Sequence, residues 1–143
     1  MSDKEKSVSD FEDFKVNIKI KLSALWTSVM FCYIYGDYFS LYVPKKVEDF
    51  ISGETLLDSP LKLFLAAVLM TVPALMIFAS IVLKPRINRW LNIVFGIFYT
   101  AIMLLIAFTS IAPWWSFYVF LALVESILTS IIVYNAVKWP RQV

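Results

Sequence analysis

Four long apolar stretches are the feature that most constrains how this chain can fold. They cover residues 22–43, 61–83, 90–111 and 114–137. Each has about 22 residues, which at ~1.5 Å per residue matches the ~30 Å hydrocarbon core of a bilayer. Strand-like alternation is absent from them. The sequence therefore predicts an all-α membrane protein, an antiparallel bundle of four transmembrane helices.

The remaining residues are too few for a separate soluble domain. Residues 1–21 are polar and form an N-terminal segment, and residues 22–143 form one transmembrane domain. The single long connection covers residues 44–59. Within it Val47, Phe50 and Ile51 share one face and Gly53 follows them, which predicts a short amphipathic helix that ends at the glycine.

The basic residues indicate an orientation. One set of span ends carries eight of them: Lys15, Lys19, Lys21, Lys84, Arg86, Arg89, Lys138 and Arg141. The opposite ends carry Lys45, Lys46 and Lys62, diluted by four acidic residues. Lysine and arginine near span ends favour the cytoplasmic side. Both termini are therefore predicted to be cytoplasmic.

The residues that usually perform catalysis are scarce. Cys32 is the only cysteine and there is no histidine. These counts exclude an intrachain disulfide, a histidine-ligated metal and a serine–histidine or cysteine–histidine nucleophile. The three glycines are scattered, so no phosphate-binding loop exists. We expect no catalytic residues, no cofactor, no metal site and no nucleic-acid partner.

Two acidic residues fall at membrane depth. Glu125 lies near the middle of the last apolar stretch, and Asp37 lies in the outer half of the first. A charged carboxylate at the bilayer centre costs about 2.5–3.5 kcal/mol on insertion scales. Such residues are therefore candidates for function.

A ligand- or proton-binding site can be assembled around these two acids. Tyr33 shares a helical stripe with Asp37, Thr129 lies one turn from Glu125, and Tyr99 lies on the polar face of the third stretch. Lys62, near the outer end of the second stretch, is a candidate partner for Asp37. The functional interpretation is an outward-open cavity with Glu125 at its floor and Asp37 near its mouth. The alternative is a protonated Glu125 that only fixes the packing of the helices.

Small residues predict where helices approach each other closely. Ala122, Ser126 and Ser130 recur every four residues in the last stretch, a spacing typical of contacts between membrane helices. We therefore expect all three side chains to contact another helix of this chain or of a second copy.

Two segments resemble a family of small bacterial four-span membrane proteins whose function is unassigned. The first runs through Leu25-Trp26, Val29-Met30-Phe31, Tyr33, Tyr35 and Asp37, and the second through Leu83-Lys84, Arg86, Asn88-Arg89-Trp90 and Asn92. The resemblance covers the chain from about Lys21 onward. It implies a prokaryotic inner membrane location and supplies no activity. Glu125 lies outside the segments that carry it.

Two functional hypotheses follow. The first is a multi-pass membrane protein with a binding or structural role, working alone or as a homo-oligomer in the lipid bilayer. The second is a proton- or cation-coupled carrier of small lipophilic or cationic molecules that uses Glu125 and Asp37. A membrane enzyme is least expected, because the chain offers neither a nucleophile with its base nor a metal site.

Overall fold

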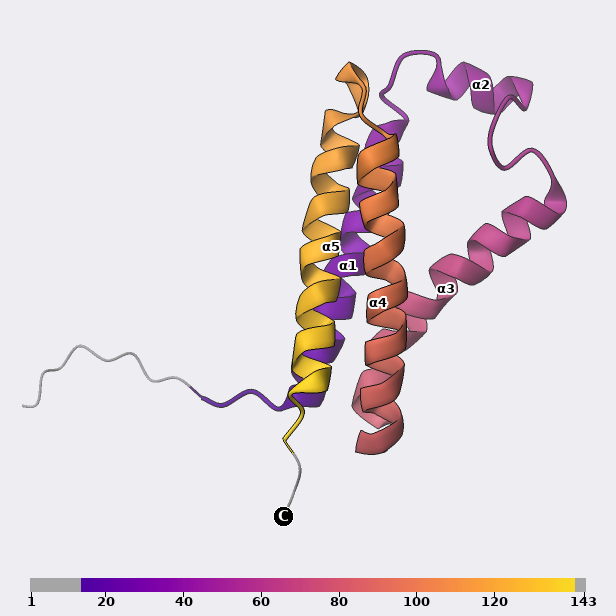
Figure 1. The fold of residues 1–143 in the computed structure, drawn as a ribbon. Helices are drawn as coiled ribbons and strands as arrows, with labels where there is room; N and C mark the ends of the chain where they lie inside the picture. The colour runs from indigo at the N-terminus through magenta and orange to yellow at the C-terminus, as the bar shows by residue number, and fades with distance from the viewer. Residues whose placement is uncertain (1–13, 141–143) are drawn as a thin grey trace, which may run out of the picture.

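A computed structural model describes residues 14–140 of the chain. In this part the structure is helical, with no β-strand. The elements, shown in Figure 1, are α1 (Ile18–Ser40), α2 (Lys46–Ser52), α3 (Pro60–Val82), α4 (Pro85–Thr109), the 3₁₀ turn η1 (Pro113–Trp115) and α5 (Ser116–Val137). The all-helical prediction is confirmed for these residues.

Local sequence explains where the helices begin and end. The side chain of Asn17 accepts a hydrogen bond from the Lys19 amide at 2.9 Å, so α1 begins at Ile18 and not at residue 22. Ser59 caps α3 in the same way, with Pro60 at the first helical position. Gly53 ends α2 with φ of 78°, a left-handed conformation that glycine adopts without strain. The predicted short helix is thereby confirmed, and residues 1–13 lie outside the described part.

Within residues 14–140 three helical segments, and not the four expected, are long and apolar enough to cross a membrane. They are Pro60–Val82, Pro85–Thr109 and Pro113–Val137. The helix α1 has the same length as α3, but Lys19, Lys21 and Asp37 lie within it. These charges make α1 the least apolar of the long helices.

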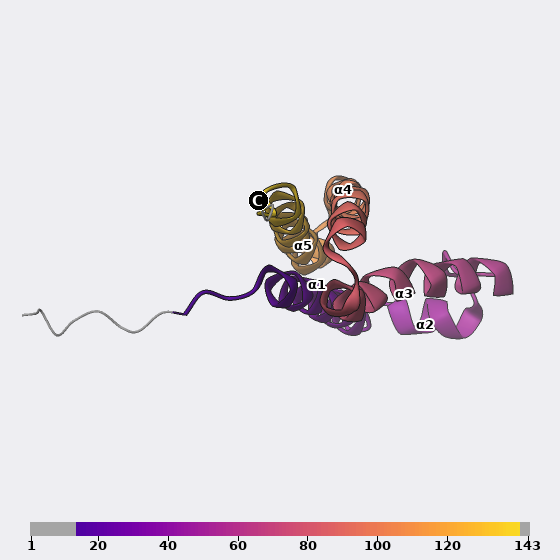
Figure 2. The same ribbon diagram turned by 90° about the horizontal axis from the view of Figure 1, so that it is seen from below.

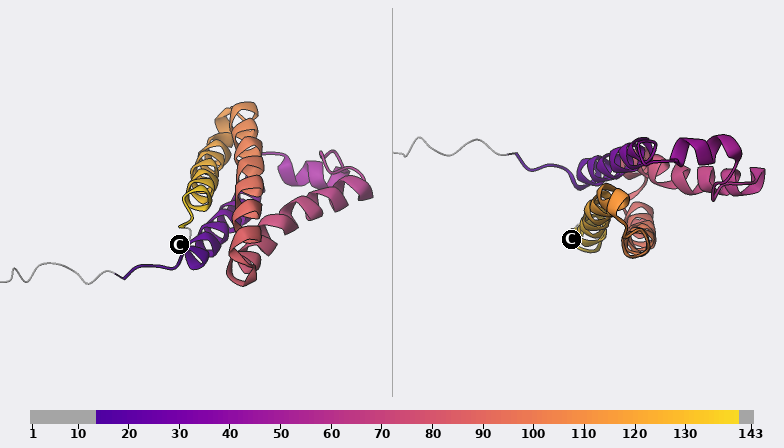
Figure 3. Two further views of the ribbon diagram at one scale, coloured as in Figure 1. Left: turned by 60° about the horizontal axis from the view of Figure 1, so that its bottom comes forward. Right: turned by 90° about the horizontal axis from the view of Figure 1, so that it is seen from above.

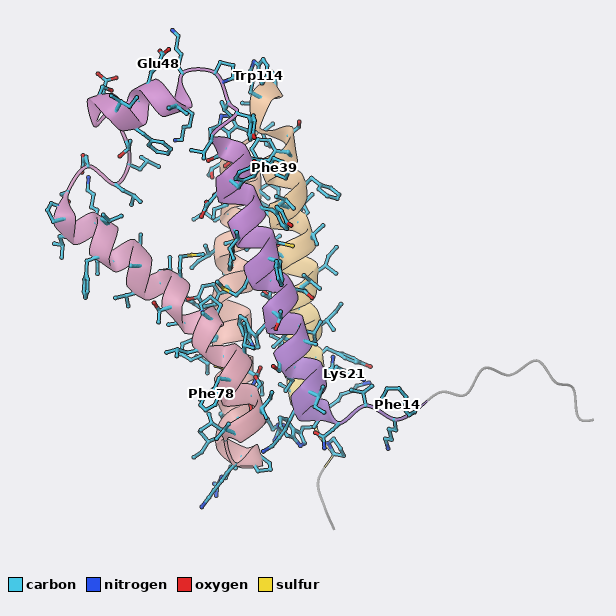
Figure 4. All side chains as sticks on the ribbon, turned by 180° about the vertical axis from the view of Figure 1, so that it is seen from behind. Phe14, Lys21, Phe39, Glu48, Phe78 and Trp114 are labelled. Carbon is cyan, nitrogen blue, oxygen red and sulfur yellow. The ribbon has the colours of Figure 1, made fainter. Side chains whose placement is uncertain are left out.

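The predicted four-helix bundle is not confirmed in its regular form. Helices α1, α4 and α5 run side by side, whereas α3 packs on α1 through its C-terminal half and leans away through its N-terminal half (Figures 2 and 3). Exposed apolar side chains cover that N-terminal half: Leu61, Leu63, Phe64, Leu65 and Val68. The start of α1, the end of α3 and the start of α4 lie at one end of the molecule, where Figure 4 labels Lys21 and Phe78. Glu48 and Trp114 lie at the opposite end.

A buried polar network joins three helices in the half of the bundle near the termini. The indole nitrogen of Trp26 in α1 donates to Asn92 Oδ1 in α4 at 2.8 Å. Asn92 Nδ2 donates to Asn88 Oδ1 at 2.7 Å, and Asn88 Nδ2 donates to the backbone carbonyl of Ser80 in α3. All four residues are fully buried. Since these polar groups satisfy one another, they fix the register of α1, α3 and α4.

The small-residue prediction is confirmed within this chain for two residues, and for the third a contact with a second copy stays a prediction. Ala122 and Ser126 are buried, but Ser130 is exposed and its hydroxyl bonds only to the Ser126 carbonyl. A row spaced every four residues drifts by about 40° per step around a straight helix, because one turn takes ~3.6 residues. By the third member the row has left the contact face. Thr129, the residue before Ser130, is fully buried and occupies the contact face instead.

At Gly96 the helices α4 and α5 approach each other closely, and Gly96→Ala is expected to weaken this contact. A Cβ at Gly96 would lie 2.6 Å from Val133 Cγ2. Valine has one favoured rotamer in a helix and cannot move aside. We expect the free energy of unfolding to fall by about 1–2 kcal/mol, as for other overpacked sites.

Gly36→Ala is the matched control for this prediction. A Cβ at Gly36 would lie no closer than 3.4 Å to Tyr118. We therefore expect unchanged or slightly increased stability, because alanine favours a helix by up to about 1 kcal/mol over glycine. SDS titration of both purified variants measures the effect. Equal stabilities would contradict the close contact at Gly96.

Candidate functional site

An internal cavity of about 110 Å³ lies between α1, α3, α4 and α5. Its apolar wall consists mainly of leucine, isoleucine and methionine side chains. Its polar lining comes from Cys32, Tyr33, Asp37, Tyr99, Tyr118 and Glu125. A cavity of this size has room for a few water molecules or a small organic group.

Glu125 occupies the cavity wall at mid-helix in α5. The residue is 3% exposed, and its backbone carbonyl accepts a hydrogen bond from the Thr129 hydroxyl at 2.9 Å. Within residues 14–140 its carboxyl group makes no hydrogen bond and no ion pair. A carboxylate without a partner is costly at such a place.

Tyr33 brings an unused hydrogen-bonding group to the same cavity. Its hydroxyl is buried and has no hydrogen-bond partner among the described residues. Tyr99, by contrast, donates its hydroxyl to the Leu69 carbonyl and is thereby held in place. Buried polar groups are normally satisfied, so an unsatisfied one that faces a cavity indicates a place for water or ligand.

Asp37 lies at the mouth of the cavity. It is exposed, and together with Tyr118 it also lines a second, open hollow of about 530 Å³ that lies toward α2 and η1. The two spaces therefore meet at Asp37 and Tyr118. In the outer hollow Lys46 places its ammonium 4.9 Å from the Phe50 ring centroid and 5.6 Å from that of Trp115. The Lys46 ammonium therefore lies over aromatic faces in the outer hollow.

The structure brings four of the six predicted site residues to one cavity. They are Glu125, Asp37, Tyr33 and Tyr99. Thr129 faces α4, where its hydroxyl lies 2.6 Å from that of Thr100.

Lys62 does not pair with Asp37 as expected. It is half exposed and forms an ion pair with Asp58 at 2.7 Å, because the two lie one helical turn apart and α3 leans away from the cavity.

Sequence reasoning did not assign Tyr118 and Cys32 to the site. Tyr118 lies seven residues before Glu125, two helical turns away on the same face, and that spacing is the signal for it. Cys32 precedes Tyr33 and lies at the edge of the buried stripe of α1, half-buried. No spacing rule would have singled it out.

The lining suits a small cation with an apolar body. Two carboxyl groups supply oxygen atoms that carry negative charge when ionised, and three tyrosine rings supply π faces that attract cations. The apolar wall suits a hydrocarbon or aromatic group. Among the described residues no group of three or more histidine, cysteine or acidic side chains could hold a metal ion.

Comparison with known proteins gives one match. The profile described as "Family of unknown function (DUF6326)" matches residues 10–143. No curated protein and no solved structure matches the chain.

Proposed function

The chain belongs to this family of unknown function, and we propose that it is a multi-pass membrane protein that binds small lipophilic cations in the cavity around Glu125. The observation that carries the proposal is the unpartnered carboxyl group of Glu125, buried in a cavity that also contains the unsatisfied Tyr33 hydroxyl. A glutamate that only fixed the packing of the helices would be expected to bond to a neighbouring hydroxyl or carbonyl group.

A cation would bind in exchange for a proton. In the empty cavity the neutral carboxyl is favoured, because an isolated charge in low dielectric is costly. An entering cation supplies the missing partner and stabilises the carboxylate, so the proton leaves. Affinity should therefore rise with pH over the range in which Glu125 titrates. Asp37 at the mouth adds negative potential that attracts cations to the entrance.

The membrane arrangement belongs to the same proposal. We infer that α1 is the fourth span, with Lys19 and Lys21 at one membrane surface and Asp37 shielded from lipid by the cavity mouth. The basic end of the bundle, with both termini, would lie on the cytoplasmic side of a prokaryotic inner membrane. The cavity mouth near α2 would face the opposite side.

Cysteine labelling tests this orientation. In a Cys32→Ser background, an impermeant maleimide added outside cells should label Glu54→Cys and leave Lys84→Cys unlabelled until the membrane is broken. Lys84 is exposed and therefore accessible to the reagent. The reverse labelling pattern would contradict the orientation.

The native Cys32 reports directly on the cavity. It lines the cavity beside Glu125 and is the only cysteine of the chain. A cationic methanethiosulfonate should modify it at least about tenfold faster than an anionic one of similar size, since the Asp37 carboxylate at the cavity mouth attracts cations. Asp37→Asn should reduce that ratio. Equal rates for both reagents in the unmodified protein would contradict a cation-attracting cavity.

A carrier would need more than this binding site. The cavity would have to open toward the termini as well, and there the Trp26–Asn92–Asn88–Ser80 network closes the bundle. Coupled transport thus requires that network to break and re-form. The geometry described here supports binding from the end near α2.

A further inference from the structure

A second, basic groove lies at the end of the bundle that holds both described termini, away from the Glu125 cavity. Its volume is about 830 Å³. Segments that are distant in the sequence form it: the start of α1, the start of α4 and the residues after α5. Three cations line it, Lys19, Arg86 and Arg89, together with Trp90 and Trp139. No acidic residue is among the described residues that line it.

Two of the three cations are held in place by helix ends. Lys19 Nζ donates to the carbonyls of Ile81 at 3.1 Å and Leu83 at 2.8 Å, at the C-terminus of α3. Arg89 Nε donates to the Ala136 carbonyl at 3.1 Å, at the C-terminus of α5. The last carbonyls of a helix lack partners within the helix, so these bonds satisfy them. They also fix two positive charges on the groove wall.

The third cation is free to bind a ligand. Within residues 14–140 the Arg86 guanidinium makes no hydrogen bond and no ion pair. Arg86 is the second residue of α4, where the positive end of the helix dipole also favours an anion. A guanidinium can bind a phosphate through two parallel hydrogen bonds.

The two tryptophans place the groove at the membrane surface. Trp90 is 59% exposed, and Trp139 packs partly against the core. Tryptophan favours the headgroup region of a bilayer, where its ring contacts acyl chains and its N–H contacts polar groups. A ligand here therefore meets positive charge on one side and lipid on the other.

We propose that this groove binds the phosphate headgroup of an anionic membrane lipid, with Arg86 as the main phosphate contact and Lys19 and Arg89 supporting it. The alternative is that these residues act only as a general signal for orientation. If the basic residues act only as an orientation signal, replacing any one of them at this end should change lipid affinity by the same factor. A built site predicts that Arg86 matters more than its neighbours outside the groove.

Lipid binding to the full chain tests the proposal. The protein is reconstituted in phosphatidylcholine vesicles that contain increasing amounts of phosphatidylglycerol with brominated acyl chains, which quench tryptophan fluorescence on contact. We expect saturable quenching in the unmodified protein. Arg86→Gln should weaken the apparent lipid affinity about fivefold, the factor that ~1 kcal/mol per basic residue corresponds to. Brominated phosphatidylcholine should not reproduce the saturable component.

Lys84→Gln is the matched control, because it removes one charge at the same end from a residue that does not line the groove. We expect less than a twofold change. Equal weakening by Lys84→Gln and Arg86→Gln would overturn the built site. If inorganic phosphate displaced the phosphatidylglycerol at a concentration similar to that of the lipid, the assignment of the groove to a lipid would be overturned.

Discussion

Asn92→Leu is expected to lower the free energy of unfolding by about 1–3 kcal/mol, the range for leaving a buried polar group unsatisfied. The substitution removes the acceptor of the indole N–H of Trp26, a fully buried residue. It also removes the donor to Asn88 Oδ1. The network links α1 to α4 and reaches α3 through Ser80. The packing of these three helices against one another should therefore loosen together.

Asn135→Leu provides the matched control. The Asn135 amide bonds only to the Ile131 carbonyl of its own helix, at 2.8 Å. We expect a change within about 0.5 kcal/mol, as for other peripheral sites. SDS titration followed by circular dichroism compares the two variants. If Asn92→Leu were as stable as Asn135→Leu, the network would not hold the helices together.

The sequence predicted the buried faces better than the arrangement of the helices. On the third stretch Asn92, Gly96, Tyr99 and Met103 recur every three or four residues, a spacing that predicts one helix face, and all four are buried. Helical periodicity within one segment suffices for such a prediction. The tilt of α3 depends on contacts between segments and on the long α1–α3 connection, which periodicity does not contain.

The same distinction applies to the candidate site. Asp37 and Glu125 were singled out because charge at membrane depth is costly, a property of each residue in its own segment. The structure brings both to one cavity. The predicted Lys62–Asp37 ion pair is wrong because it required α3 to lie close to α1 along its whole length. Lys62 instead forms an ion pair with Asp58, four residues earlier. The unsatisfied Tyr33 hydroxyl was invisible to the sequence, since only the three-dimensional surroundings show the missing partner.

Glu125→Gln is expected to weaken the binding of a small lipophilic cation at least about thirtyfold, or roughly 2 kcal/mol or more, the cost of removing one partner of a buried charge pair. The amide preserves the size of the side chain and the packing of α5. Thermal stability should therefore change little, because the neutral carboxyl of Glu125 makes no hydrogen bond within the described part that the amide would lose. Glu125→Leu should bind equally poorly.

Phenyltrimethylammonium is a suitable probe for this prediction. Its charge is permanent, so any pH dependence of binding belongs to the protein. Its uncharged isostere, tert-butylbenzene, has the same shape and controls for partition into detergent or lipid. The isostere should bind the unmodified protein and Glu125→Gln alike, since it lacks the charge that the carboxylate stabilises.

Isothermal titration of phenyltrimethylammonium into the purified protein over a range of pH tests the central claim most directly. The unmodified protein should bind more tightly as pH rises and release a proton on binding, whereas Glu125→Gln should bind weakly and without pH dependence. Equal affinity of the two proteins at every pH, with both folded, would contradict the assignment of Glu125 as the cation site.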